Sequence, residues 1–291
     1  MFQQNCSDLL RPLGLLATIV IITGLAGCHR ANRQATVLDL KPYAGTDLRT
    51  VDVTVGGQSS PFIFDTGGGL TILTPEQIKN AGCAPFGQVV GFRADGSKLT
   101  MHRCGPVIIE IGGYRVREEV EPFDLMSLLG KGAPPVGGLL GLNAFDGKAV
   151  TLDLAHNRVV VETRHSLARR IRDMHPIPIR IVRGAGGDVE PFIEVRARTG
   201  TLWMEVDSGN NGPVFLAPNA QQQLGIQIPQ GKKRRLDLDV VGLGKIPATV
   251  ASRNMIYDGQ LDPGFLKQLV LTVDFNRRKA WALYAAADKS P

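Results

Sequence analysis

Two aspartates in matching surroundings are the residues of this sequence best suited to do chemistry. Asp65 ends the run Phe-Ile-Phe-Asp and is followed by Thr-Gly, and Asp207 ends the run Met-Glu-Val-Asp and is followed by Ser-Gly, 142 positions further on. Burial at the end of an apolar strand raises the pKa of a carboxyl, and a second carboxyl beside it makes double ionisation unfavourable. Two such groups would share one proton, so that one acts as general base on a water molecule while the other polarises a carbonyl.

The surroundings of the two aspartates belong to an internal duplication. Residues 62–82 correspond to residues 204–225, because each has an apolar run, the aspartate motif, a second apolar run and a proline-led polar segment ending in glycine. The hairpin-like segments 150–161 and 271–282 also correspond. A repeat this long indicates a duplicated lobe rather than a solenoid, whose repeats span roughly 20–50 residues.

Alternating apolar residues and frequent turn residues predict a mainly β protein with two lobes and few short helices. Helices are expected to begin at Pro75 and Pro218, because proline suits the first position of a helix. The expected segments are a signal peptide (1–27), a tether (28–35), an N-terminal lobe (36–164), an inter-lobe linker (165–176) and a C-terminal lobe (177–287).

The first residues are typical of an export signal. Residues 12–27 are uncharged and follow Arg11, and their apolar part is shorter than the about 20 residues that span a bilayer. They end in Leu-Ala-Gly-Cys28, which resembles the lipobox of bacterial lipoproteins. The resemblance implies that Cys28 is lipidated and anchors the protein in the bacterial cell envelope, facing the periplasm, and His29 favours the outer membrane. A retained signal-anchor helix is the alternative.

Composition excludes several classes of protein. The chain has 291 residues, a formal charge of +6, 43% hydrophobic and 21% charged residues, which is ordinary for a globular protein and wrong for a disordered or collagen-like one. The basic runs 169–172 and 232–235 are expected to be solvated, with binding to anionic lipids or acidic polymers as the alternative. No nucleic-acid-binding module is present, and no dinucleotide, P-loop or G-x-S-x-G motif competes for the site.

Cysteine and histidine usage bears on cross-links and metals. Outside the signal and lipobox the chain has only Cys83 and Cys104, which in an oxidising compartment are candidates for a disulfide. Two buried free thiols are the alternative. The five histidines are scattered and no CxxC or HExxH pattern occurs, so neither a metal site nor a cofactor is expected.

The aspartate motifs resemble the two active-site loops of pepsin-like aspartic proteases. Residues 138–141, Gly-Leu-Leu-Gly, are similar to the hydrophobic-hydrophobic-glycine element of that family's ψ-shaped loop, and the chain most resembles the compact bacterial, retropepsin-like members. The site residues implied are Asp65 and Asp207 as catalytic groups, Thr66, Gly67, Ser208 and Gly209 as their support, and Leu139, Leu140 and Gly141 as the packing of the ψ-loop.

The resemblance also implies a pepsin-like fold, with two similar β-barrel-like lobes and a cleft between them. The hydroxyls of Thr66 and Ser208 would cross-link the two loops, while Gly67 and Gly209 would allow a tight turn that brings backbone N–H groups to the carboxylates. The implied activity is endopeptidase cleavage of a peptide or protein substrate. The protein is expected to be a monomer, since one chain carries both half-sites.

Aspartic proteases close a β-hairpin flap over the cleft, and residues 89–104 are the candidate for it here. Asp95-Gly96 is a plausible hairpin turn. Phe92 is the only aromatic residue in this segment, and it either faces the cleft or serves packing.

Three departures from the family pattern leave the activity open. They are Gly68-Gly69 after the first motif, Asn210-Asn211-Gly212 after the second, and Asp262 where the duplication places Gly141. We expect them to loosen the geometry, and Asp262 in particular to prevent tight packing of the second turn. The alternative function is therefore a peptide-binding envelope lipoprotein that keeps the cleft but catalyses weakly or not at all.

Overall fold

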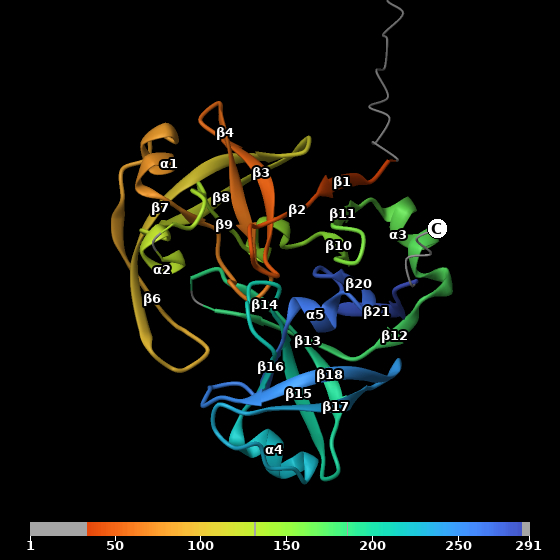
Figure 1. The fold of residues 1–291 in the computed structure, drawn as a ribbon. Coiled ribbons are helices and arrows are strands. Elements are labelled where there is room, and N and C mark those ends of the chain that lie inside the picture. The colour runs from red at the N-terminus through yellow and green to blue at the C-terminus, as the bar shows by residue number, and fades with distance from the viewer. Residues whose placement is uncertain (1–33, 131, 185, 287–291) are drawn as a thin grey trace, which may run out of the picture. The chain divides into compact units, whose positions relative to one another are not determined.

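The computed structural model describes residues 34–130, 132–184 and 186–286 (Figure 1). The predicted signal, the lipobox and Cys28 lie outside the described residues. The described chain is mainly β, with 21 strands in three sheets and helices of at most seven residues, so the predicted class is confirmed. None of the helices among these residues is long and apolar enough to cross a lipid bilayer.

The first sheet forms the N-terminal lobe. In sheet order its strands are β2 (Lys41–Pro42), β3 (Arg49–Val55), β4 (Gln58–Phe64), β9 (Gly138–Leu140), β5 (Ile72–Leu73), β8 (Tyr114–Pro122), β7 (Lys98–Ile111) and β6 (Phe86–Phe92). β3 also pairs with β7, which closes most of the sheet into a barrel. Val51, Val53 and Val55 of β3 are buried with Phe62 and Phe64 of β4, since alternate residues of a strand face the same side.

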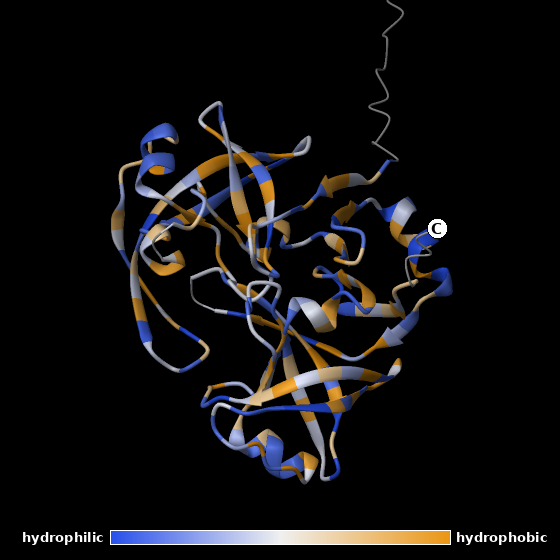
Figure 2. Cartoon of the chain, in the orientation of Figure 1, coloured by the Kyte–Doolittle hydropathy of each residue, from blue (hydrophilic) through white to orange (hydrophobic). Residues whose placement is uncertain are grey.

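The second sheet forms the C-terminal lobe in the same way. Its strands in order are β13 (Ile179–Arg183), β14 (Val189–Arg196), β15 (Thr201–Val206), β19 (Gly259–Leu261), β16 (Val214–Leu216), β18 (Gly244–Ser252) and β17 (Lys233–Val240). β14 also pairs with β17 and closes this barrel. Figure 2 shows apolar and polar residues alternating along these strands, as a sheet with one buried face requires.

A third sheet joins the two halves of the duplication. Its order is β1 (Thr36–Asp39), β11 (Arg158–Glu162), β10 (Ala149–Asp153), β20 (Leu269–Asp274), β21 (Lys279–Tyr284) and β12 (His175–Ile177). The hairpins β10–β11 and β20–β21 are the segments that the repeat matched. They meet where Thr151 pairs with Thr272, whose hydroxyl oxygens lie 2.8 Å apart.

The short helices follow their local sequence signals. They are α1 (Pro75–Asn80), α2 (Met126–Leu129), α3 (Arg164–Arg170), α4 (Pro218–Leu224) and α5 (Pro263–Leu266), with 3₁₀ turns η1 (Leu142–Phe145) and η2 (Ile171–Asp173). α1 and α4 begin at the predicted prolines, which confirms both. The segment 165–176, expected as an unpatterned linker, contains most of α3, all of η2 and the start of β12. Thr163 and Ser166 form a capping box that begins α3.

Candidate active site

Equivalent strand pairs place the two aspartates. β4 runs parallel to β9, and the backbone N–H of Asp65 donates to the carbonyl of Leu140 at 3.1 Å. β15 runs parallel to β19, and the N–H of Asp207 donates to the carbonyl of Leu261, also at 3.1 Å. Each aspartate therefore extends a buried strand into a turn that a short partner strand holds.

The expectation that Asp262 prevents tight packing of the second turn is wrong. The bond from Asp207 to Leu261 has the same length as its counterpart in the first lobe. The Asp262 side chain instead accepts a hydrogen bond from the N–H of Phe265 at 3.0 Å and caps α5. A carboxylate is therefore accommodated where the first lobe has glycine, because a helix begins there.

The two carboxyls lie close enough for each to shift the pKa of the other. Oδ1 of Asp65 accepts from the N–H of Gly67, and Oδ1 of Asp207 from the N–H of Gly209, both at 2.9 Å. A Cβ on Gly209 would overlap the Asp65 carboxyl, and one on Gly67 would lie 2.6 Å from Cγ of Asp207. Neither glycine has a positive φ, so they are required for the close approach of the opposite carboxyl rather than for the turn conformation that the sequence suggested.

The hydroxyls of Thr66 and Ser208 cross-link the two turns. Oγ1 of Thr66 donates to the carbonyl of Val206 at 2.6 Å and accepts from the N–H of Ser208 at 2.9 Å. Oγ of Ser208 donates to the carbonyl of Phe64 and accepts from the N–H of Thr66, both at 3.0 Å. Both side chains are fully or almost fully buried. Four reciprocal bonds therefore fix the distance between the aspartates.

Electrostatics distinguishes the two aspartates. Burial is the main cause that raises the pKa of each carboxyl. The negative charges of Asp65 and Glu205 raise the pKa of Asp207 further, well above its ordinary value. Hydrogen bonds from the N–H of Gly67 and from Asp207 pull the pKa of Asp65 back down. Burial and mutual repulsion therefore favour one proton shared by the pair over ionisation of both carboxyls.

An amide that sequence reasoning left without a role also reaches the pair. Nε2 of Gln260, on β19, donates to Oδ2 of Asp207 at 2.9 Å and to Oε2 of Glu205 at 2.7 Å. Asn210 does not reach the carboxyl, since its Nδ2 donates to the carbonyl of Pro213. Gln260 thus supplies Asp207 with a second donor, on the oxygen that the N–H of Gly209 does not reach. The available signal was the polar pair Glu205 and Gln260 at positions where the first lobe has Ile63 and Leu139.

The predicted flap is the hairpin of β6 and β7. Its tip turns at Arg93–Ser97, where Oδ1 of Asp95 accepts from the N–H of Ser97 at 2.9 Å and Gly96 has a φ of 81°. The N–H of Ile256, in the C-terminal lobe, donates to the carbonyl of Ala94 at 2.9 Å. The hairpin is therefore bonded to the opposite lobe in this structure, and a bound chain must displace this contact or pass beneath it.

The space beside Asp65 is a cavity of about 260 Å³, whose lining does not include Asp207. Its walls come from both lobes and the hairpin, and include Asp65, Phe92, Leu139, Glu190 and Glu205. An adjoining cavity of about 440 Å³ lies along β6 and is also lined by Gly184, Gly186, Asp188 and Glu190. Phe92 contributes to both, although 62% of it is exposed, so it lies at the rim of the cleft rather than in the core.

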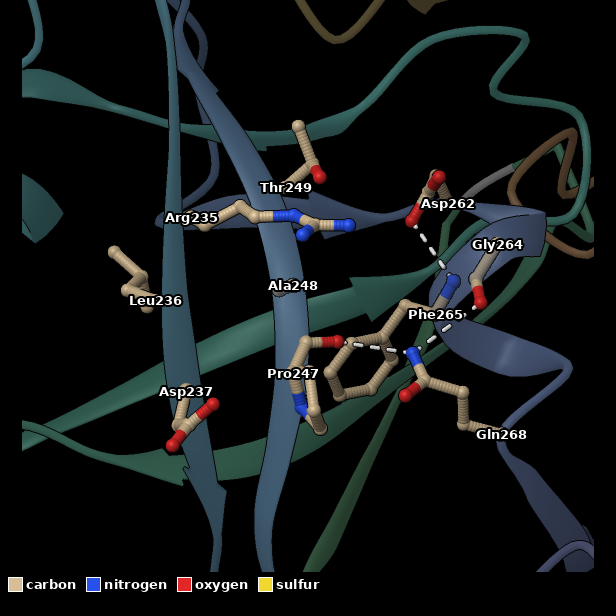
Figure 3. A pocket seen from close by; sticks show the side chains of 10 residues that line it. All are labelled: Arg235, Leu236, Asp237, Pro247, Ala248, Thr249, Asp262, Gly264, Phe265 and Gln268. Atoms are coloured by element: carbon tan, nitrogen blue, oxygen red, sulfur yellow. Dashed lines mark hydrogen bonds between the residues drawn. The ribbon is translucent and has the colours of Figure 1, made fainter.

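Another hollow, of about 590 Å³, lies away from the aspartates, between β17, β18 and α5 (Figure 3). Two of its polar side chains are used locally, since Nε2 of Gln268 donates to the carbonyls of Pro247 and Gly264 while Asp262 caps the helix. We therefore assign it no chemistry.

Cys83 and Cys104 form a disulfide, with their Cα atoms 6.0 Å apart. Cys104 is buried in β7 at the base of the hairpin, so the bond ties the returning strand to the segment after α1. Within the described residues no three His, Cys, Asp or Glu side chains gather as a metal site.

Comparison with solved structures identifies the fold. Basic 7S globulin from soybean matches with a TM-score of 0.58 and 10% identity, over 86% of this chain and 94% of that one. Conglutin gamma, a basic 7S globulin from lupine seeds, matches with 0.57 and 11%, over 86% and 95%, and edgp with 0.55 and 11%, over 85% and 94%. The fold is therefore the pepsin-like two-lobed fold, as predicted.

The predicted membership of the bacterial aspartic protease family is not supported and must be corrected. No protein-family model matches the chain, and no curated protein matches it in sequence. The two globulins come from soybean and lupine and are not bacterial aspartic proteases, and at 10–11% identity all three structures establish the fold alone. What the chain does must be argued from its own site.

Proposed function

We propose that the chain hydrolyses peptide bonds by acid–base catalysis at the Asp65–Asp207 pair. The observation that carries the proposal is a buried pair of neighbouring carboxyls whose turns are fixed by reciprocal bonds, with Asp65 lining a cavity. Burying two carboxyls side by side costs free energy, and groups perturbed in this way beside a cleft are typical of catalytic sites.

In the proposed reaction, ionised Asp65 takes a proton from a water molecule whose oxygen attacks the peptide carbonyl carbon. Asp207 gives its proton to the carbonyl oxygen, which leaves a neutral tetrahedral intermediate. When the C–N bond breaks, Asp65 passes its proton to the leaving nitrogen and one hydroxyl of the intermediate returns a proton to Asp207. The products are a carboxylic acid and an amine, and the pair regains its starting protonation.

Two features of the cleft favour an extended peptide as substrate. Phe92, Leu128 and Ile256 are large apolar side chains at least half exposed, and all three line the cavities near the aspartates. Exposed apolar residues gathered at a cleft mark a binding surface. β6 is the last strand of its sheet, so one edge of its backbone is free to pair with a bound chain.

The test is digestion of a reduced, carboxymethylated protein between pH 3 and 8, with the products identified by mass spectrometry. We expect cleavage by the wild type and none by Asp65→Asn or Asp207→Asn. Asp237→Asn is the matched control, because Asp237 is exposed and lies outside the cleft. Cleavage by either aspartate variant at the wild-type rate, or no cleavage by the wild type, would refute the proposal.

Peptide binding without hydrolysis is the second candidate. It is favoured by the absence of a hydroxyl at Gly68 and Asn210, the residues that follow the two motifs, and by the use of the Asn210 amide within its own turn. In that case peptides would bind in the cleft and be recovered intact.

We also propose that the chain is exported and anchored through Cys28, facing the periplasm. The Cys83–Cys104 disulfide supports this, because structural disulfides persist in oxidising compartments. Mass spectrometry of the mature amino terminus tests it. A diacylated Cys28 is expected, and an intact N-terminal segment would contradict it.

A further inference from the structure

The two lobes present different chemistry at equivalent positions beside the aspartates. In the first lobe Ile63 of β4 pairs with Leu139 of β9, and in the second Glu205 of β15 pairs with Gln260 of β19. The apolar pair of one lobe is thus a carboxyl and an amide in the other. Glu205 is only 1% exposed, and burying a carboxyl costs more than burying isoleucine at the same place. The fold itself does not require this substitution, since the first lobe packs with isoleucine.

A second carboxyl lies on the same side of the cavity. Glu190 of β14 accepts a hydrogen bond from the hydroxyl of Tyr257 at 3.1 Å, and Glu190, Tyr257 and Glu205 all line the 260 Å³ cavity. Oε2 of Glu205 accepts from Gln260, but no bond to its other oxygen is present among the described residues. The cavity therefore has a carboxyl oxygen at its wall with hydrogen-bonding capacity left over.

Arg93, at the tip of the hairpin, also lines the cavity, but its charge is not among those that act on Glu205 or Glu190. The charges that act on Glu205 are those of Glu190 and Asp65, and the charges that act on Glu190 are those of Asp188 and Asp65. None of the ion pairs within the described part of the chain includes any of these four side chains. A ligand with a positive charge would supply the missing partner.

The other walls of the cavity fit an alkyl chain. Leu139 and Ile72 come from the first lobe, and Phe123, Leu125 and Leu128 from the segment around α2. A lysine or arginine side chain combines an apolar stem with a cationic end, which matches apolar walls that end at carboxyls. A purely apolar side chain would leave the carboxyls unpaired, and an acidic one would be repelled.

We propose that this cavity is a specificity subsite for a lysine or arginine side chain directly adjacent to the scissile bond, with Glu205 and Glu190 as its counter-charges. The proposal rests on the peptidase function proposed above and adds the class of substrate. Glu205 and Glu190 bind and position the substrate, whereas the Asp65–Asp207 pair carries out the chemistry.

The subsite has a pH signature. Burial raises the pKa of Glu205 well above its ordinary value and that of Glu190 to about 7. A cation binds best when these groups are ionised, so its binding releases a proton and its affinity rises with pH through this range. The charge of Asp65 raises the pKa of both glutamates and that of Asp188 raises the pKa of Glu190. The Tyr257 hydroxyl lowers the pKa of Glu190 and the Gln260 amide lowers that of Glu205, but burial outweighs both. Preference for lysine over its uncharged analogue norleucine should therefore grow between pH 5 and pH 8.

The experiment uses the full chain and a peptide library that varies each position around the scissile bond. We expect at least tenfold higher kcat/KM for lysine or arginine than for norleucine at one position next to that bond. Glu205→Gln should bring this ratio close to one, while Glu118→Gln, which changes a buried carboxyl outside the cavity walls, should leave it unaltered. Dyad-dependent cleavage with no cationic preference overturns the subsite and leaves the peptidase proposal standing.

If nothing is cleaved, the subsite is tested by binding alone. A peptide with a hydroxyethylene isostere in place of the scissile bond is made with lysine or norleucine next to the isostere. Isothermal titration should show at least tenfold tighter binding of the lysine form, reduced by Glu205→Gln. Equal affinities, or no binding of either peptide, overturn the inference.

Discussion

Replacement of Thr66 by valine tests whether the cross-link between the two turns stabilises the fold. Valine has nearly the shape of threonine but lacks the hydroxyl, so the change removes hydrogen bonds without opening a cavity. Oγ1 of Thr66 donates to the carbonyl of Val206 at 2.6 Å and accepts from the N–H of Ser208 at 2.9 Å. Thr66 is fully buried, so no solvent replaces the lost partner.

The expected cost follows from the groups left unpaired. A buried donor or acceptor without a partner costs about 1–3 kcal/mol, so the loss of both bonds should lower the free energy of unfolding by about 2–4 kcal/mol. Ser208→Ala removes the two symmetry-equivalent bonds, to Phe64 and Thr66, and should cost a similar amount. Thr66→Ser is the matched control, because it keeps the hydroxyl and loses only a methyl group.

The assay is urea unfolding followed by far-ultraviolet circular dichroism and by the fluorescence of Trp203 and Trp281. The first tryptophan lies in the C-terminal lobe and the second in the third sheet, whereas circular dichroism reports on the strands of both lobes. Coincident transitions by the two probes show that the protein unfolds as one unit. If the free energy of unfolding of Thr66→Val lies within about 0.5 kcal/mol of that of Thr66→Ser, the buried cross-links do not stabilise the two turns as proposed.

Three other substitutions have expected outcomes that rest on the same geometry. Gly209→Ala should reduce peptidase activity at least about 100-fold, because its methyl group overlaps the Asp65 carboxyl and misplaces the pair; activity within threefold of wild type would contradict this. Burial raises the pKa of Glu118 and of Glu121 to about 8, so the folded state holds these protons more tightly than the unfolded state. The free energy of unfolding should therefore fall as pH rises from about 5 to 8. In urea titrations, Glu118→Gln should make this fall smaller by about 2–4 kcal/mol. The same fall in the variant and the wild type would refute the role of Glu118. Cys83→Ser should lower the free energy of unfolding by about 3 kcal/mol relative to the oxidised wild type, because the loop constraint is lost. An unchanged free energy of unfolding would show that the disulfide does not stabilise the fold.

The duplication makes the fold predictable from the sequence. Apolar alternation and turn residues are local signals, and their repetition at a fixed offset is enough to indicate two equivalent lobes. The prolines that begin α1 and α4 are equally local signals. The third sheet was not foreseen, because the pairing of β10 with β20 joins segments more than one hundred residues apart, and each hairpin is locally complete without it.

The polar wall of the cleft was missed for a related reason. Glu205 stands directly within the second aspartate motif, yet its partner Gln260 and its neighbour Glu190 come from distant strands. The misjudged effect of Asp262 arose because glycine was assumed to be necessary at that position, whereas a helix that begins there gives the carboxylate a backbone donor. A position-by-position comparison of the two copies of the repeat would have drawn attention to both Glu205 and Asp262.

The central claim is that Asp65 and Asp207 together activate water. Its most direct test is kcat/KM for one cleaved peptide as a function of pH, for the wild type and for Asp207→Asn. We predict a bell-shaped profile for the wild type, with one limb for each titration of the coupled pair, and a loss of at least about 1000-fold in the variant at every pH. Activity of Asp207→Asn within tenfold of the wild type, with the bell unchanged, would contradict it.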